Sequence, residues 1–211
     1  MVALAEGCCQ LTDLEIVNRR DNGGITDVSV LKIFESCQQF EALGLSGLPA
    51  LTDESLHAVE KNCKCLQYLI LVELSVSNAG LKTLFASPNL NELRRVVFES
   101  LDLFDDTILE LVKNNHATLG SLEISKCNNV TDVAMCYISQ HCTQLKDLSL
   151  CDLPCVSHPI YIAEILRRNL KLVDLSCASL GSQSRIVDEA KKLVPTLQTL
   201  LDENKKRLSQ S

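Results

Sequence analysis

A leucine-rich motif of the form L-x-x-L-x-L recurs about every 26 residues along this 211-residue chain. Seven copies begin at positions 11, 40, 66, 93, 119, 145 and 170, and a degraded eighth copy begins at Leu197. A fixed period of about 20 to 50 residues is typical of a solenoid, in which each repeat packs only against its neighbours. The period therefore predicts one domain over residues 1–211, with about seven to eight repeats. Stacked repeats also favour a binding surface over a catalytic pocket.

The fifth repeat shows most clearly what one unit contains. Residues 119–125 alternate apolar and polar side chains, which predicts a half-buried strand. Residues 126–129 predict a turn, after which Thr131 or Asp132 can accept backbone N–H groups as a helix N-cap. Apolar side chains then follow at helical spacing over residues 133–140. Strand, turn and helix in every copy predict an α/β solenoid, a horseshoe segment with parallel strands on the concave face and helices on the convex face.

The capping signal recurs 11 to 14 residues after each strand begins, at residues 25–27, 51–53, 76–78, 104–106, 130–132 and 156–158. In the last of these Ser157 is expected to cap the helix rather than His158, and Pro159 suits the first helical turn. The residues before Leu11 resemble the end of a helix, so the repeat array is expected to start in mid-repeat. Either these residues shield the core, or a partner covers it, or the chain is a piece of a longer product. Residues 202–211 are almost wholly polar and predict a C-terminal cap.

Composition argues against several classes of function. A net charge of −7 and a pI near 5.1 disfavour a surface that follows nucleic-acid phosphates. The one basic run, at residues 205–207, is better explained as a solvated helix end than as a nuclear-localisation or RNA-binding signal. No stretch resembles a signal peptide or approaches the length of a membrane span. The eleven cysteines are odd in number and follow the repeat, so we expect free thiols in a reducing cytoplasmic or nuclear compartment.

Cysteines share a register with the leucines, and this register carries a family resemblance. Cys8, Cys37, Cys63 and Cys142 each precede a strand's first apolar position by three residues, and Cys127 follows its strand in the turn. The unit C-x-x-L-x-x-L-x-L-x-x-C-x-x-[IV]-T-D resembles the cysteine-containing leucine-rich repeat of F-box/LRR proteins and of antagonist-of-mitotic-exit-network proteins. The fourth repeat lacks both cysteines, and the seventh lacks the Thr-Asp pair.

The resemblance implies a protein-interaction module, most concretely substrate recognition in a Skp–cullin–F-box-type ubiquitin-ligase system. Skp–cullin components are then expected partners. No F-box is visible in the sequence; the Leu-Pro pair at residues 48–49 lies inside the second repeat, at the strand exit. The alternative is a leucine-rich scaffold or complex-assembly factor unrelated to ubiquitin.

Alternation of the strand residues predicts which side chains line the concave face, where a protein partner is expected. Three apolar side chains follow one another there in the third repeat: Tyr68, Ile70 and Val72, with Val97 alongside. An exposed apolar patch rimmed by charge is typical of a binding site, so the candidate partner-binding residues are Tyr68, Ile70, Val72, Arg95, Val97, Glu99 and Glu123. Glu123, Asp147 and Asp174 form a predicted acidic stripe, so the partner segment is expected to be apolar or basic. The alternative is that the patch only reflects β-favouring residues on a crowded sheet.

Residues that carry chemistry are sparse. Cys63 and Cys65 resemble metal ligands, as do Cys151, Cys155 and His158, but the second set lacks an obvious fourth ligand. His141 adjoins Cys142, whose register directs it inward, and no Gly-rich phosphate loop is present. The sequence therefore predicts a protein that is not an enzyme and that holds no metal or cofactor.

Overall fold

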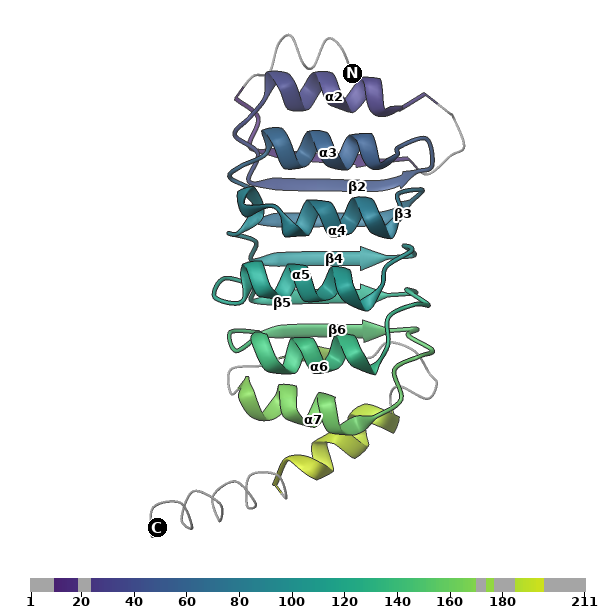
Figure 1. The fold of residues 1–211 in the computed structure, drawn as a ribbon, viewed down its shortest axis with the longest axis vertical. Coiled ribbons are helices and arrows are strands. Elements are labelled where there is room, and N and C mark those ends of the chain that lie inside the picture. Colours follow the sequence, from purple (N-terminus) through teal and green to yellow (C-terminus); the bar gives the residue numbers. More distant parts are fainter. Residues whose placement is uncertain (1–9, 19–23, 170–173, 177–184, 196–211) are drawn as a thin grey trace.

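The computed structural model describes residues 10–18, 24–169, 174–176 and 185–195. In these residues strands and helices alternate along the chain and stack in one direction (Figure 1). The strands are β1 (Asp13–Val17), β2 (Ala42–Leu48), β3 (Tyr68–Leu74), β4 (Arg95–Glu99), β5 (Ser121–Ser125), β6 (Asp147–Cys151) and β7 (Asp174–Ser176). The helices are α2 (Asp27–Ser36), α3 (Asp53–Asn62), α4 (Asn78–Ala86), the 3-10 turn η1 (Pro88–Leu90), α5 (Asp105–Asn115), α6 (Asp132–His141) and α7 (Pro159–Arg168), followed by a helix over residues 185–195.

The described strands form one parallel sheet in chain order, β1 to β7, with the helices layered on one side of it. A helix is wider than the spacing of about 4.8 Å between strands, so the helix layer is convex and the strand layer is concave. The predicted leucine-rich solenoid is confirmed. The predicted start in mid-repeat, the degraded repeat at Leu197 and the polar cap over residues 202–211 lie outside the described residues. No helix in the described parts of the chain is both long and apolar enough to cross a bilayer.

The core lies between the sheet and the helices, and the motif's leucines fill it. In β2 the inward side chains Leu43 and Leu45 are 1% and 0% exposed, and the equivalent positions of β3 to β6 are buried to the same degree. Two aromatic pairs lie edge to face within the core: Phe34 with Phe40, at 5.9 Å between ring centroids, and Phe85 with Phe98, at 5.4 Å. The inward half of the predicted alternation is therefore confirmed.

Cysteines of the predicted register are part of this core. Cys37, Cys63 and Cys142 are the C-caps of α2, α3 and α6, and each is fully buried. Cys127 is also buried, and its thiol lies 3.3 Å from the Ser125 carbonyl oxygen. Cys8 lies outside the described residues. Small apolar side chains fit where the chain turns from helix back to strand, so these cysteines pack as hydrophobic residues.

Five successive repeats have a residue of left-handed backbone conformation at the same place, near the C-terminal ends of β2 to β6. These residues are Gly47, Glu73, Ser100, Lys126 and Asp152, with φ between 50° and 65°. Such a conformation costs a non-glycine residue about 1–3 kcal/mol, so the surrounding repeats must hold it in place. At Gly47 a Cβ atom would lie 2.3 Å from the Asn18 carbonyl oxygen, so this position also requires glycine for space. The turn sends the chain sharply from the sheet toward the helix layer.

The helix caps agree with the predicted Thr-Asp signal only in part. Thr52, Ser77 and Thr131 are N-caps whose side chains accept backbone N–H groups, as predicted. Thr26 occupies the same position without a capping bond, and Phe104 is the N-cap of α5. The expectation that Ser157 caps α7 is wrong, because His158 is the N-cap and Pro159 follows it. The Ser157 hydroxyl instead donates to Asp132, at 2.9 Å.

The aspartates of these motifs connect each repeat to the next. Asp105 accepts hydrogen bonds from the Thr131 backbone N–H at 2.8 Å and from its hydroxyl at 2.7 Å. Asp27 does the same for Thr52, Asp53 for Ser77 and Asp132 for Ser157, always about one repeat further on. In α4, Asn78 replaces the aspartate and accepts from the Phe104 backbone N–H and the Thr107 hydroxyl. These bonds form a polar ladder along the N-terminal ends of the helices.

Acid should weaken helix α7 through Glu164. Its carboxylate accepts hydrogen bonds from the guanidinium of Arg167 at 2.5 and 2.8 Å and from Arg168 at 2.8 Å. Chiefly because of the Arg167 bonds, the pKa of Glu164 is lowered from 4.5 to about 2. Since the pKa is lower in the folded state, this stabilisation is complete above pH 4.5 and is lost as the pH falls toward 2.

We therefore expect the Glu164→Gln protein to lose less of its free energy of unfolding between pH 6 and pH 3 than the unsubstituted protein loses. Urea titrations at the two pH values measure this difference. Glu35→Gln, at an exposed position of α2, is the control. An equal pH response in the Glu164→Gln and control proteins would show that the Glu164 cluster does not carry the effect.

Candidate protein-interaction surface

The concave face of the sheet brings together every predicted partner-binding residue. Parallel pairing places Tyr68 beside Arg95, Ile70 beside Val97, and Val72 beside Glu99. The next pairing places Val97 beside Glu123. Three rows of side chains therefore run across the sheet, perpendicular to the strands. The seven predicted residues form one block on β3, β4 and β5.

Exposure within this block differs from the predicted patch at one residue. The Tyr68 side chain faces solvent and is 44% exposed, whereas Ile70 and Val72 are half-buried. Val97 was expected to be an exposed apolar residue, and this is wrong, because it is only 8% exposed. It is not part of the core between sheet and helices. Instead, Ile70 and Glu123 flank it on the neighbouring strands and limit its contact with solvent.

An apolar hollow lies beside Tyr68. It has a volume of about 230 Å³ and is lined by Asp13, Leu14, Glu15, Ala42, Leu43, Gly44, Tyr68 and Ile70. Gly44 lies at its centre in the register, between Glu15 on β1 and Ile70 on β3. A Cβ atom on Gly44 would lie 3.1 Å from the Glu15 Cγ atom. The missing side chain of Gly44 therefore helps to make the hollow, and Tyr68 and Ile70 form its apolar wall.

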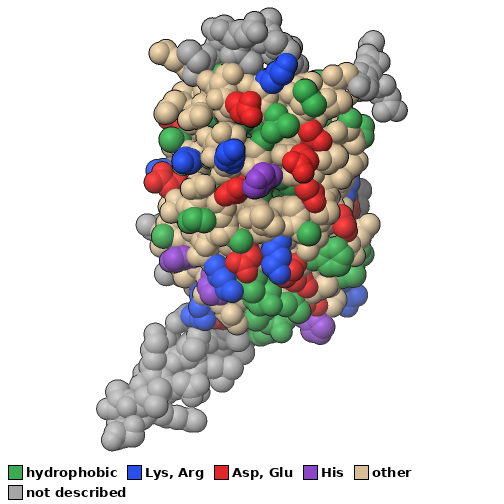
Figure 2. Space-filling view, turned by 45° about the horizontal axis from the view of Figure 1, so that its top comes forward, with side chains coloured by type: hydrophobic (Ala, Val, Ile, Leu, Met, Phe, Trp, Pro, Cys, Tyr) green, Lys and Arg blue, Asp and Glu red, His purple; other side chains and the backbone are tan. Residues whose placement is uncertain are grey.

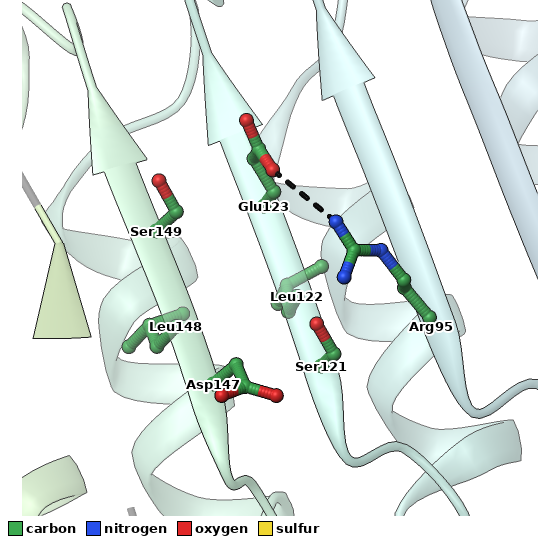
Figure 3. A pocket seen from close by; sticks show the side chains of 7 residues that line it. All are labelled: Arg95, Ser121, Leu122, Glu123, Asp147, Leu148 and Ser149. Carbon is green, nitrogen blue, oxygen red and sulfur yellow. Dashed lines mark ion pairs between the residues drawn. The ribbon is translucent and has the colours of Figure 1, made fainter. Parts of the chain in front are cut away.

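A second, polar hollow lies further along the sheet, on β4 to β6 (Figure 3). Its volume is about 370 Å³, and it is lined by Arg95, Ser121, Leu122, Glu123, Asp147, Leu148 and Ser149. The Arg95 guanidinium lies 3.9 Å from the Glu123 carboxylate, which is a long ion pair between two partly exposed side chains. Such a pair contributes about 0–1 kcal/mol, so both groups can be redirected to a partner at little cost.

The predicted acidic stripe is present on the described strands. Glu123 and Asp147 lie on neighbouring strands and both line the polar hollow. Glu99 lies at the end of β4, where its carboxylate accepts a 2.6 Å hydrogen bond from the Lys126 ammonium group. That bond, followed by the charge of Glu99, raises the pKa of Lys126. The backbone of Asp174 is described in β7, but its side chain lies outside what the structure describes.

The described cysteine and histidine side chains are not arranged as a reactive nucleophile or a metal site would require. Burial raises the pKa of Cys63 and of Cys142 to about 12, so both thiols stay protonated near neutral pH. In the described parts of the chain no three His, Cys, Asp or Glu side chains are grouped so that they could hold a metal ion. These observations concern only the residues described, and the absence of an activity stays a prediction.

Ser157, His158 and Asp132 lie together at the start of α7 and superficially resemble a catalytic triad. The Asp132 carboxylate lies 2.6 Å from the His158 Nδ1 atom, and the Ser157 hydroxyl lies 3.1 Å from that same nitrogen. A triad needs serine and aspartate on opposite ring nitrogens, so that the histidine can pass a proton between them. The cluster instead belongs to the ladder that connects neighbouring repeats.

The described part of the convex face mixes exposed apolar side chains with charged ones. Figure 2 shows acidic and basic side chains interspersed with apolar ones over the helices and the N-terminal end of the stack. Of the apolar side chains that are substantially exposed there, Val133 and Ile160 lie on the neighbouring helices α6 and α7, whereas Val28 lies on α2. The concave block is therefore the stronger candidate surface.

Three comparisons place the chain among known proteins. No protein-family model matches it. It is 23% identical over 207 residues to the BTB/POZ domain-containing protein FBL11 of Arabidopsis thaliana; the match covers 97% of this chain and 20% of that protein. The chain thus spans about a fifth of the length of this curated relative.

Among solved structures, the chain is similar to one in the yeast Rad7 and Elc1 complex, with a TM-score of 0.48, 20% identity, and coverage of 77% of this chain and 60% of the other. It is similar to the tropomodulin C-terminal domain of Caenorhabditis elegans, with a TM-score of 0.39, 14% identity and 96% coverage of each chain. It also resembles the leiomodin-1 actin-binding site 2, with a TM-score of 0.34, 14% identity, and coverage of 99% of this chain and 95% of the other. These likenesses are too distant to carry an argument about function.

Proposed function

We propose that this chain is a non-catalytic protein-interaction module that holds a partner protein on its concave sheet face. The observation that carries the proposal is the apolar wall of Tyr68 and Ile70 beside a hollow of about 230 Å³. Tyrosine in the centre of an interface, next to a pocket and rimmed by charge, is typical of binding hot spots. The rim here is supplied by Asp13 and Glu15 on β1 and by Arg95 on β4.

We further propose that the bound partner is a substrate of a ubiquitin-ligase system of the Skp–cullin–F-box type. The support is the cysteine and leucine register, which resembles the repeats of F-box/LRR proteins, and the burial of Cys37, Cys63, Cys127 and Cys142 in that register. In such a system the repeats hold the substrate and a separate F-box recruits the ligase. The present surface corresponds to the substrate-holding half. A reducing compartment, cytoplasmic or nuclear, is part of the same proposal.

Purification of the tagged protein from its own cells tests the ligase assignment. We expect Skp-type and cullin components to be recovered together with at least one further protein, identified by mass spectrometry. Recovery of partners that depend on the concave face, without any ligase component in repeated purifications, would refute the ligase assignment. That result would support a scaffold or complex-assembly role instead.

The concave-face assignment predicts that Tyr68→Ala combined with Ile70→Ser abolishes partner recovery while folding is retained. Both side chains project from the sheet away from the core, so the free energy of unfolding should change by about 1 kcal/mol or less. Thermal unfolding followed by circular dichroism measures stability, and the same purification measures binding. Val28→Ser with Val133→Ser is the matched control, since it removes two exposed apolar side chains from the convex face. A double variant that folds and keeps every partner would exclude this block as the site.

A further inference from the structure

Charge is distributed unevenly between the concave face and the rest of the protein. Strands β1 to β6 each place three residues on that face, eighteen in all. Five of these are carboxylates and one is a guanidinium: Asp13, Glu15, Glu99, Glu123, Asp147 and Arg95. Eighteen residues therefore carry a net charge of −4, whereas the whole 211-residue chain carries −7. Lys126 neutralises Glu99 from the strand end, and the face stays clearly acidic.

The carboxylates of this face that form no ion pair among the described residues lie at both hollows: Asp13 and Glu15 line the apolar hollow, and Asp147 lines the polar hollow. Arg95 contacts Glu123 at 3.9 Å, and for Asp147 the described residues provide no ion pair. Asp147 shares its row with Ser121 and Arg95, while Glu123 shares the adjacent row with Ser149. A lysine or arginine side chain of a partner, placed in this hollow, would meet two carboxylates and two serine hydroxyls. A carboxylate placed there would meet Arg95 but would be repelled by Glu123 and Asp147, because the three charged side chains of the hollow carry a net charge of −1.

The two hollows are separated by a distance that an extended peptide spans in a few residues. The apolar hollow, lined from β1 to β3, is centred on β2, and the polar hollow, lined from β4 to β6, is centred on β5. Three strand spacings of about 4.8 Å give roughly 14 Å between them. An extended chain advances about 3.3 Å per residue, so roughly four residues bridge the gap. Ile70 and the covered Val97 lie between Gly44 and Glu123 in the same row of the sheet, so the path between the hollows is apolar.

We propose that the concave face binds an extended basic segment of its partner, which places one apolar side chain over Gly44 and one lysine or arginine over Glu123 and Asp147, about four residues apart. This inference rests on the proposed function, because it specifies what the same surface recognises. The apolar side chain displaces water from the hollow walled by Tyr68 and Ile70 and supplies hydrophobic affinity. The basic side chain supplies charge complementarity and selects against acidic segments.

A displayed library of random twelve-residue peptides, selected against the purified chain, tests this inference directly. We expect enriched peptides to carry a net positive charge and to place an apolar residue about four positions from a lysine or arginine. Fluorescence anisotropy of the best enriched peptide then gives its Kd at two salt concentrations. Affinity should fall as salt rises, because partly exposed charge pairs are screened. Enrichment of acidic or uncharged peptides, or no enrichment, would overturn the inference.

Substitutions in each hollow distinguish the contributions of the two hollows to peptide affinity. Glu123→Lys with Asp147→Lys should weaken the peptide by at least about tenfold at low salt and by less at high salt. Gly44→Val should fill the apolar hollow and weaken the peptide by about tenfold at both salt concentrations. The control for total charge is Glu35→Lys with Asp188→Lys, at exposed positions on helices, which should change affinity by less than about twofold. Circular dichroism confirms that each variant folds, and the charge reversal remains informative if Gly44→Val does not.

The possible outcomes distinguish this inference from the function on which it rests. If Tyr68→Ala with Ile70→Ser abolishes binding but the charge reversal and the control behave alike, the interaction surface stands and the basic segment is refuted. If enriched peptides bind equally well to every concave variant, both the inference and the concave site are refuted. If the charge reversal selects acidic peptides in a repeated library selection, the assignment of Glu123 and Asp147 is supported.

Discussion

Phe98→Ala is expected to destabilise the protein by about 3–5 kcal/mol, the usual cost of truncating a fully buried phenylalanine. The Phe98 side chain is 0% exposed and meets the Phe85 ring edge to face at 5.4 Å. It projects from β4, in the middle of the described stack, where parallel pairing places it between Leu71 of β3 and Ile124 of β5. In a solenoid, stability is a sum of repeat and neighbour terms, so damage at the centre weakens the coupling between the two halves.

Urea unfolding followed by circular dichroism measures this loss, and a broadened or biphasic transition would report the uncoupled halves. Phe104→Ala is the matched control, because Phe104 is 41% exposed at the N-cap of α5 and makes no capping bond through its side chain. We expect the control to cost no more than about 1 kcal/mol. Equal losses in the two variants would mean that the assignment of inward and outward positions is wrong.

Asn115→Ala is expected to cost about 2–4 kcal/mol, although it removes only one small polar group. The buried Asn115 side chain accepts a hydrogen bond from the Leu93 backbone N–H at 2.9 Å and donates to the Leu111 carbonyl oxygen at 3.2 Å. It thereby joins the end of α5 to the chain just before β4. Alanine would leave the Leu93 N–H buried without a partner, and a buried unsatisfied donor carries most of this cost.

Asn114→Ala is the control at the adjacent residue, whose partly buried amide donates one bond to the Phe85 carbonyl oxygen at 2.6 Å. Its loss should cost about 1 kcal/mol. Chemical denaturation measures both variants, and amide hydrogen exchange should show faster exchange at Leu93 only in Asn115→Ala. An unchanged exchange rate at Leu93 would contradict the role assigned to Asn115. The Asn169 side chain accepts the corresponding bond from the Leu145 backbone N–H, at 2.9 Å, so a second described repeat is joined in the same way.

Much of the architecture could be predicted because the chain is a repeat: the structure inferred for one unit applies to every other unit. The spacing of leucines located the described strands β1 to β7, and their order follows because neighbouring repeats stack. Alternation identified Leu43 and Leu45 as core, and the cysteine register identified Cys37, Cys63 and Cys142 as buried. These properties depend on periods of two and of 26 residues, which are visible along the chain.

The candidate surface could be predicted only in part, because exposure depends on lateral neighbours. Tyr68, Ile70 and Val72 were correctly placed on the concave face, but Val97 is covered by side chains from β3 and β5. The two small residues Ala42 and Gly44 indicate room beside Tyr68 already in the sequence. Only the structure shows that this room is a hollow that extends to Glu15 on the preceding strand. The residue pattern of one strand does not show how large the side chains on the two neighbouring strands are, so it does not determine how much of its own side chains they cover.

What the amino-acid sequence determined by itself is the solenoid: the parallel sheet, the inward leucines and cysteines, and the face on which a partner is expected. Only the tertiary structure decided how the repeats are joined and where the surface is hollow. Asp105 bonds to Thr131 in the next repeat, and Asn115 bonds to the chain before β4. The physical reason is that burial and alternation follow from local periodicity, whereas hydrogen bonds and hollows arise between residues about 25 positions apart, whose side-chain directions are set only once the stack has formed.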